Sequence, residues 1–136
     1  MENFDLDGFL NLDEKEGAFM QVRNPVTDEE ILDSENNPVG INLISSDTKK
    51  FRTAAYKAND RLNRNTAKNL ETPTEDAYVM NTESLARSTV SWSGIQFQGE
   101  MLECNFRNAV KLYDSLPWLR EQVNAFIQDR ENYLVK

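Results

Sequence analysis

The chain has 136 residues, the length of one domain, and carries a net charge of -8 at pH 7. It has no histidine and one cysteine, Cys104, which excludes Ser-His and Cys-His catalytic pairs and an internal disulfide and strongly disfavours a zinc site. No apolar run approaches the ~20 residues that span a bilayer. We therefore expect a protein that is not an enzyme. We also expect no cofactor or metal site, and neither nucleic acid nor membrane as a partner.

The acidity of the chain is concentrated near its start. Residues 1–36 hold eleven acidic and two basic residues, a net of -9, whereas the remaining hundred hold twelve acidic and thirteen basic residues. We interpret residues 1–16 as an acidic N-terminal tail and residues 17–136 as a single small domain. The start lacks the basic and then apolar pattern of a signal peptide, so we expect a reducing cytoplasm as the location.

The tail contains a segment, Asn3–Glu14, that overlays the EF-hand calcium loop. Acidic residues fall at its third, fifth and twelfth positions, and Gly8 falls at the sharp turn. Asn3 stands where aspartate is the usual first ligand, and an acidic segment with one glycine matches this pattern by chance fairly often. A mobile acidic tail is therefore the favoured interpretation. A calcium-modulated binding module stays open as a function of another class.

Alternating apolar residues predict a small antiparallel β-meander over residues 17–45. The alternation over residues 18–22 predicts one strand, residues 30–32 a short second strand, and residues 39–43 a third. Two Asn-Pro dipeptides between these segments are turn signals. Beyond this meander, residues 46–136 form the helical part of the domain.

Four helices are predicted in that part, at about 47–68, 73–92, 105–114 and 116–134. Ser45 or Ser46 would cap the first helix, and Thr72-Pro73 is a strong start for the second. Gly94 is the expected stop of the second helix, before a loop that reaches Leu102. The fold class is therefore α+β, mainly α-helical, with a small N-terminal antiparallel β-meander followed by three to four helices.

Basic residues at helical spacing form one stripe along the predicted helix 47–68. The candidate partner-binding residues of this stripe are Lys50, Lys57, Arg61, Arg64 and Lys68. Such a stripe suits an acidic partner or nucleic acid. A solvated helix face and a face covered by the acidic N-terminal segment are the alternatives. No aromatic residues interleave with the stripe, which disfavours binding of single-stranded nucleic acid.

The remaining conspicuous side chains favour structural roles. Trp92 and Trp118 stand at a predicted helix end and a predicted helix start, where large aromatic residues more often anchor a core than a partner. Cys104 precedes a helix, and with no histidine in the chain a structural thiol is favoured over a nucleophile. Nothing in the sequence separates the acidities of Glu100 and Glu103, so they are not assigned as a catalytic pair.

Four pieces of the chain carry a resemblance to a known family. They are Asn24-Pro-Val-Thr-Asp-Glu-Glu-Ile-Leu with Pro38-Val-Gly-Ile-Asn-Leu; Asp47-Thr-Lys-Lys-Phe-Arg; Leu85-Ala-x-x-Thr-Val-x-Trp-x-Gly-Ile95; and Phe106-x-Asn-Ala-x-x-Leu-Tyr113. In this order they resemble the tail assembly chaperones of long-tailed bacteriophages. One departure is Asp28, which stands where the family has a glycine, so we expect a different turn type there.

The resemblance implies assembly rather than catalysis. Such chaperones bind the long, apolar, helical tape measure protein during tail morphogenesis, help recruit tail tube subunits, and are absent from the finished particle. The implied partners are the tape measure protein and the tail tube protein, in the host cell cytoplasm, and a homo-oligomer stays open. The alternative is a structural protein of the tail or head-tail junction that is retained in the virion. The apolar surface of the last two helices is the expected groove wall, with the basic stripe as its rim.

Overall fold

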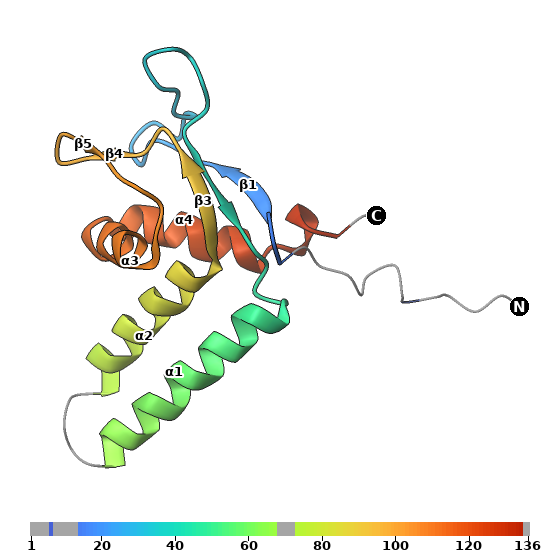
Figure 1. The fold of residues 1–136 in the computed structure, drawn as a ribbon, viewed down its shortest axis with the longest axis vertical. Coiled ribbons are helices and arrows are strands. Elements are labelled where there is room, and N and C mark those ends of the chain that lie inside the picture. Colours follow the sequence, from blue (N-terminus) through green and yellow to red (C-terminus); the bar gives the residue numbers. More distant parts are fainter. Residues whose placement is uncertain (1–5, 7–13, 68–72, 135–136) are drawn as a thin grey trace, which may run out of the picture.

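The computed structural model describes residues 6, 14–67 and 73–134. It contains a three-stranded antiparallel sheet, four helices and a small second hairpin (Figure 1). In chain order the elements are β1 (Ala18–Gln21), β2 (Gly40–Leu43), α1 (Lys49–Ala67), α2 (Pro73–Ser88), β3 (Thr89–Ser93), β4 (Gln96–Phe97), β5 (Glu100–Met101), α3 (Phe106–Ser115), α4 (Pro117–Gln128) and the 3-10 turn η2 (Arg130–Asn132). The predicted class, α+β with a small antiparallel sheet and a mainly helical remainder, is confirmed.

The strand order β1-β2-β3 places β2 in the centre of the sheet. Helices α3 and α4 lie across one face of the sheet, while α1 and α2 form an antiparallel pair that projects away from it (Figure 1). Both α1 and α2 lie between β2 and β3 in the chain, so the projecting pair is an insertion between two neighbouring strands. Its two helices pack chiefly on each other, and α2 also packs on α3.

The core lies between the sheet and the two C-terminal helices. Its fully buried side chains include Ile41 and Leu43 of β2, Leu85 of α2, and Tyr113 of α3. From α4, the predicted apolar face contributes Leu119, Val123 and Ile127, which recur at helical spacing. The Tyr113 hydroxyl shares a hydrogen bond of 2.6 Å with Thr89 Oγ1, so the one polar group of this buried ring is satisfied.

The predicted helix 73–92 is wrong at its end. Helix α2 stops at Ser88, and the next five residues form β3, which pairs with β2 in the register Ile41↔Trp92 and Asn42↔Ser91. Ser88 Oγ and Thr89 Oγ1 both donate to the carbonyl oxygen of Leu85, and these side-chain bonds compete with continued helix. The edge of β2 opposite β1 is free to pair with the residues that follow. These residues are β-branched and aromatic, types that favour a strand.

The other boundaries differ in smaller ways. Residues 30–32, predicted as a strand, make only the isolated bridges Arg23↔Glu30 and Leu32↔Pro38, so the third strand of the sheet is β3 instead. The expected loop after Gly94 contains the short hairpin β4–β5. The predicted helix 116–134 ends at Gln128, where the backbone of Asp129 becomes extended before η2.

The start of α1 uses caps that the sequence did not indicate. Thr48, rather than Ser45 or Ser46, caps the helix, because its Oγ1 accepts from the backbone N–H of Phe51. The Glu14 carboxylate accepts from the backbone N–H of Lys50, which places a negative charge at the positive end of the helix dipole. Of the segment Asn3–Glu14, which overlays the EF-hand pattern, only Leu6 and Glu14 lie within the described residues.

Asp47, predicted for the first turn of α1, precedes the helix and forms an ion pair. Its Oδ2 lies 2.7 Å from Arg130 Nε, which ties the segment before α1 to η2 near the end of the chain. The hydrogen bond and charge of Arg130 hold the pKa of the Asp47 carboxyl below its usual value.

We expect Gly17→Ala to destabilise the fold strongly. Gly17 has φ +70°, and an added Cβ would lie 2.3 Å from the carbonyl oxygen of Leu43. The left-handed backbone and the overlap together should lower the free energy of unfolding by about 3 kcal/mol.

Gly99→Ala is the matched control, since Gly99 has φ +84° but no atom within 4 Å of its Cβ position. Urea unfolding should show a loss of only about 1 kcal/mol for Gly99→Ala. Equal losses would show that the contact with β2 is looser than described.

We expect the Asp47–Arg130 pair to make stability fall at acid pH. Because the folded pKa of Asp47 is lowered, its contribution is complete above the unfolded pKa of about 3.9 and is lost as pH falls through the folded pKa. Arg130→Gln should return the pKa of Asp47 toward its ordinary value. An NMR titration of the carboxyl carbon measures this directly, and an unchanged pKa in the variant would contradict the pairing.

Candidate binding site

A groove of about 400 Å³ lies between α1 and α2 on the projecting helix pair. We call it the α1–α2 groove. It is lined by Ala54, Lys57, Ala58, Asp60, Arg61 and Arg64 of α1 and by Glu83, Ser84 and Arg87 of α2. Small side chains form its apolar part, and four cationic side chains surround it. The groove is therefore a basic site built by two helices that are neighbours in the chain.

The structure brings together three of the five predicted partner-binding residues. Lys57, Arg61 and Arg64 line the groove because they share one face of α1. Lys50 is exposed in the first turn of α1 and is not among the lining residues, and Lys68 lies outside the described residues. Sequence reasoning missed Arg87, because only the packing of α2 against α1 places it beside the stripe.

An ion pair across the groove joins its two helices. Arg61 Nη2 donates to Glu83 Oε2 at 2.9 Å, with the Arg61 side chain half exposed and that of Glu83 mostly covered. This pair neutralises one cation of the groove. Among the described residues, Lys57 and Arg64 form no such ion pair, so they are free to meet a ligand.

Arg87, in the last turn of α2, is held in place by the aromatic ring of Phe106 in α3. Its guanidinium lies 3.7 Å from the centroid of the Phe106 ring at the start of α3. Stacking fixes the plane of the guanidinium while its edge remains able to donate hydrogen bonds. Arg87 is thus a preorganised donor for a carboxylate or phosphate oxygen.

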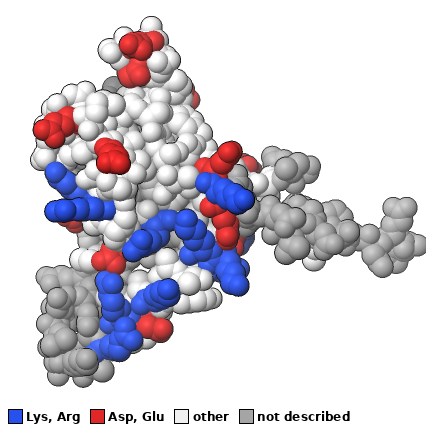
Figure 2. Space-filling model, in the orientation of Figure 1, with Lys and Arg blue, Asp and Glu red and all other residues white. Residues whose placement is uncertain are grey.

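Charge is unevenly spread over the face drawn in Figure 2. Lys and Arg gather over its middle and lower part, with some Asp and Glu among them, whereas the upper tip, where a loop between β1 and β2 lies, shows Asp and Glu without basic neighbours. The described residues of the loops between β1 and β2 include the acidic Asp28, Glu29, Glu30, Asp33 and Glu35. The net charge of -8 therefore hides a basic region suited to an acidic ligand.

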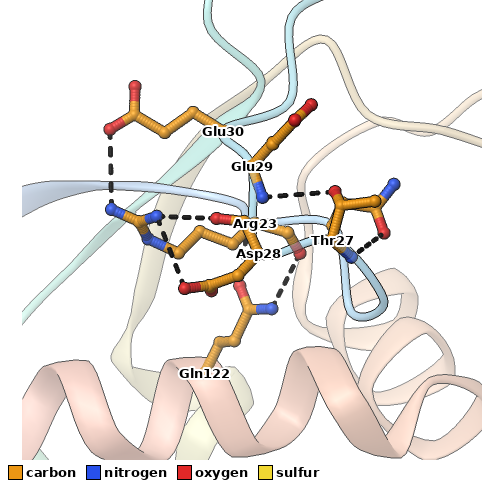
Figure 3. A network of polar contacts seen from close by, with 7 residues as sticks. Arg23, Thr27, Asp28, Glu29, Glu30 and Gln122 are labelled. Atoms are coloured by element: carbon orange, nitrogen blue, oxygen red, sulfur yellow. Dashed lines mark hydrogen bonds and ion pairs between the residues drawn. The ribbon is translucent and has the colours of Figure 1, made fainter.

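The acidic loop after Arg23 is held by a network of polar contacts (Figure 3). The backbone N–H of Asn24 donates to the carbonyl oxygen of Glu29 at 2.8 Å, and Arg23 Nη1 donates to the carbonyl oxygen of Asp28 at 2.8 Å. Gln122 of α4 bonds both backbone groups of Arg23, with its Oε1 accepting and its Nε2 donating. Helix α4 thereby satisfies both backbone polar groups of Arg23, just beyond the end of β1.

Asp28 has a left-handed backbone, with φ +62°, a conformation that glycine adopts without steric penalty. The expected difference in turn type at this position stays a prediction.

A second surface is an apolar cleft of about 600 Å³ between the β1–β2 loops, the β4–β5 hairpin and the junction of α3 and α4. We call it the apolar cleft. Its apolar lining residues are Val22, Ile31, Leu32, Val39, Ile95, Met101, Leu112, Leu116, Trp118 and Leu119. Leu32 and Met101 are 51% and 68% exposed, although both are large and apolar. Two such side chains beside an apolar cleft make it a candidate contact surface.

The last two helices supply part of the apolar lining of the cleft, through Leu112, Leu116 and Leu119. Their expected role as the wall of a partner-binding groove stays a prediction. The basic stripe is not the rim of the cleft, because none of the residues that line the apolar cleft comes from α1. The two surfaces are separate because α1 packs on α2 rather than on the C-terminal helices.

The other side chains singled out in the sequence have structural contacts. Trp92 and Trp118 pack against the core, and Trp92 Nε1 donates to the carbonyl oxygen of Leu102 at 2.9 Å. Cys104 is half-buried, and this burial raises the pKa of its thiol, so the thiol stays protonated at neutral pH. Glu100 and Glu103 are exposed on the surface.

Within the described part of the chain, no three His, Cys, Asp or Glu side chains converge as a metal site would require. Nor does any helix within residues 14–67 and 73–134 have the length and apolarity to cross a membrane. Comparison of the chain with protein-family models, with curated proteins and with solved structures gave no match.

We expect the Arg61–Glu83 pair to contribute modestly to the stability of the helix pair. Both side chains are partly solvated, so a double-mutant cycle with Arg61→Gln and Glu83→Gln should give a coupling energy of about 0.2–1 kcal/mol. Urea unfolding of the four proteins measures it. Arg64→Gln with Glu83→Gln is the control cycle and should show no coupling. A coupling above about 2 kcal/mol in the first cycle would mean that the pair is far less solvated than described.

Proposed function

We propose that this protein is a tail assembly chaperone of a long-tailed bacteriophage, which binds the tape measure protein in the host cell cytoplasm. The resemblance of four ordered sequence pieces motivates the proposal. The observation that carries it structurally is the apolar cleft, with Leu32 and Met101 exposed at its edge. A cleft of this composition can receive the apolar face of a helix.

The chemistry of the cleft suits repeated contacts with one long partner. A chaperone of this kind meets many different stretches of the tape measure protein, so its surface must accept varied apolar side chains. Met101 is unbranched and flexible, which lets it adapt to different neighbours. The cleft is also lined by Asp33 and Glu35, whose charges favour solubility of the coated complex.

The partner is tested by co-expression with the tape measure protein whose gene we expect directly downstream of this chain's gene. We expect the chain to raise the soluble fraction of that partner and to form a complex that survives gel filtration. Leu32→Asn and Met101→Gln should each weaken binding about tenfold, because burial of such a side chain is worth about 1.5 kcal/mol or more.

Val26→Asn is the matched control variant. Val26 is an apolar residue that is 90% exposed on the acidic loop and does not line the cleft, so its replacement should leave binding unchanged. Equal solubility of the tape measure protein with and without this chain would contradict the proposal. Mass spectrometry of purified particles separates the alternative, since a structural tail or head-tail junction protein would be found in the virion and a chaperone would not.

A further inference from the structure

Helix α1 is incompletely covered. It is the longest helix of the described chain, with 19 residues, yet none of its described side chains is fully buried. Its apolar stripe, Phe51, Ala54, Ala55 and Ala58, is only half-buried, whereas α3 and α4 each have three fully buried side chains. An amphipathic helix is stabilised mainly by packing of its apolar face, so α1 has surface left for another element.

The α1–α2 groove has room for that element. Ala54 and Ala58 of α1 and Ser84 of α2 are small, which allows the backbone of a third helix to approach closely. Such a helix would convert the projecting pair into a three-helix layer. Its side chains would cover the half-exposed alanine stripe that α2 leaves open.

The charge around the groove selects the kind of helix. From Lys49 to Ala67, α1 carries six basic residues and one acidic residue, a net charge of +5. Lys57 and Arg64, seven positions apart, stand about 10 Å apart along the axis of α1. Arg87 faces the same groove from α2 and is fixed by the Phe106 ring. Carboxylates at seven-residue spacing on a partner helix would meet Lys57 and Arg64 together.

We propose that the α1–α2 groove binds an acidic amphipathic helix of another protein. Its carboxylates pair with Lys57, Arg64 and Arg87, and its small apolar residues pack on Ala54 and Ala58. This partner site is separate from the apolar cleft, and the inference does not rest on the chaperone function. It assigns the chain a second partner, recognised by acidic rather than purely apolar chemistry.

Other occupants fit the groove less well. A second copy of α1 would bring its own net charge of +5 against the first, which opposes association through this helix. Nucleic acid would place phosphates beside Asp60 and Glu83, which also line the groove. Those two carboxylates are compatible with a protein helix, whose own basic residues can face them.

The test uses the full chain and a synthetic fluorescent helix of about 20 residues, with Glu at seven-residue spacing beside a stripe of Ala and Leu. A matched peptide has Gln at every Glu position, and a single-stranded DNA oligonucleotide is the third probe. Fluorescence anisotropy should show the Glu peptide binding about tenfold more tightly than the Gln peptide, through three weak ion pairs. Amide chemical shifts should change along α1 and α2.

Variants on the surface of the chain complete the test. Lys57→Gln with Arg64→Gln should remove most of the tenfold preference for the Glu peptide over the Gln peptide, because only the pair with Arg87 remains. Arg107→Gln with Lys111→Gln removes two exposed bases of α3 outside the groove and should leave affinity unchanged. Equal binding of the two peptides, shifts confined to the apolar cleft, tighter binding of the oligonucleotide, or no binding at millimolar peptide would each overturn the proposal. Failure of the tape measure experiment would leave this result unaffected.

Discussion

The pairing of β2 with both of its neighbours determines the rest of the structure. Ile41 and Leu43 are fully buried, and the strand joins β1, which precedes it, to β3, which follows two helices later. Gly40 permits the close approach of β1, since a Cβ there would lie 2.2 Å from the Phe19 ring and 2.5 Å from the carbonyl oxygen of Met20. Because β2 and β3 are adjacent, the chain between them must leave the sheet and return to it. Helices α1 and α2 are that excursion, and their projection from the body follows from the sheet topology (Figure 1).

This arrangement separates two kinds of surface. The apolar cleft lies where α3 and α4 meet the loops of the sheet, so its walls belong to the main core. The α1–α2 groove lies on the projecting pair, whose helix α2 contributes Leu85 and Ala86 to that core and also packs on α3 and α4. The residues that line the groove and those that line the cleft do not overlap. One small domain therefore presents two surfaces of different chemistry.

Local patterns predicted the elements whose burial is periodic. The alternation of Val39, Ile41 and Leu43 gave β2 correctly because alternate residues of that strand enter the core. The face of α4 was predicted because Leu119, Val123 and Ile127 recur at helical spacing. Strand β3 was missed, since Leu85, Thr89 and Trp92 also fit a helical face. Its strand conformation depends on pairing with β2, a contact far along the chain.

The candidate site, like the fold, was predictable where it depends on local spacing and not where it depends on long-range packing. Lys57, Arg61 and Arg64 share a helix face by spacing alone, so the stripe could be identified from the sequence. Its separation from the apolar cleft and the contribution of Arg87 could not, because both depend on which helices pack together. Neither Glu83 nor Phe106 carries a sequence signal of its role, since each acts through a contact with a distant arginine.

The physical character of the groove sets the kind of binding that it can support. Exposed ion pairs contribute little free energy each, and the Arg61–Glu83 pair already occupies one of the four cations. Affinity must therefore come mainly from covering the alanine stripe of α1, while Lys57, Arg64 and Arg87 determine which helix is accepted and how fast it associates. An apolar floor of small residues with charged borders gives weak, selective and salt-sensitive association. The apolar cleft has none of the cations of α1 in its lining, so its binding of an apolar helix should respond to salt far less than that of the groove.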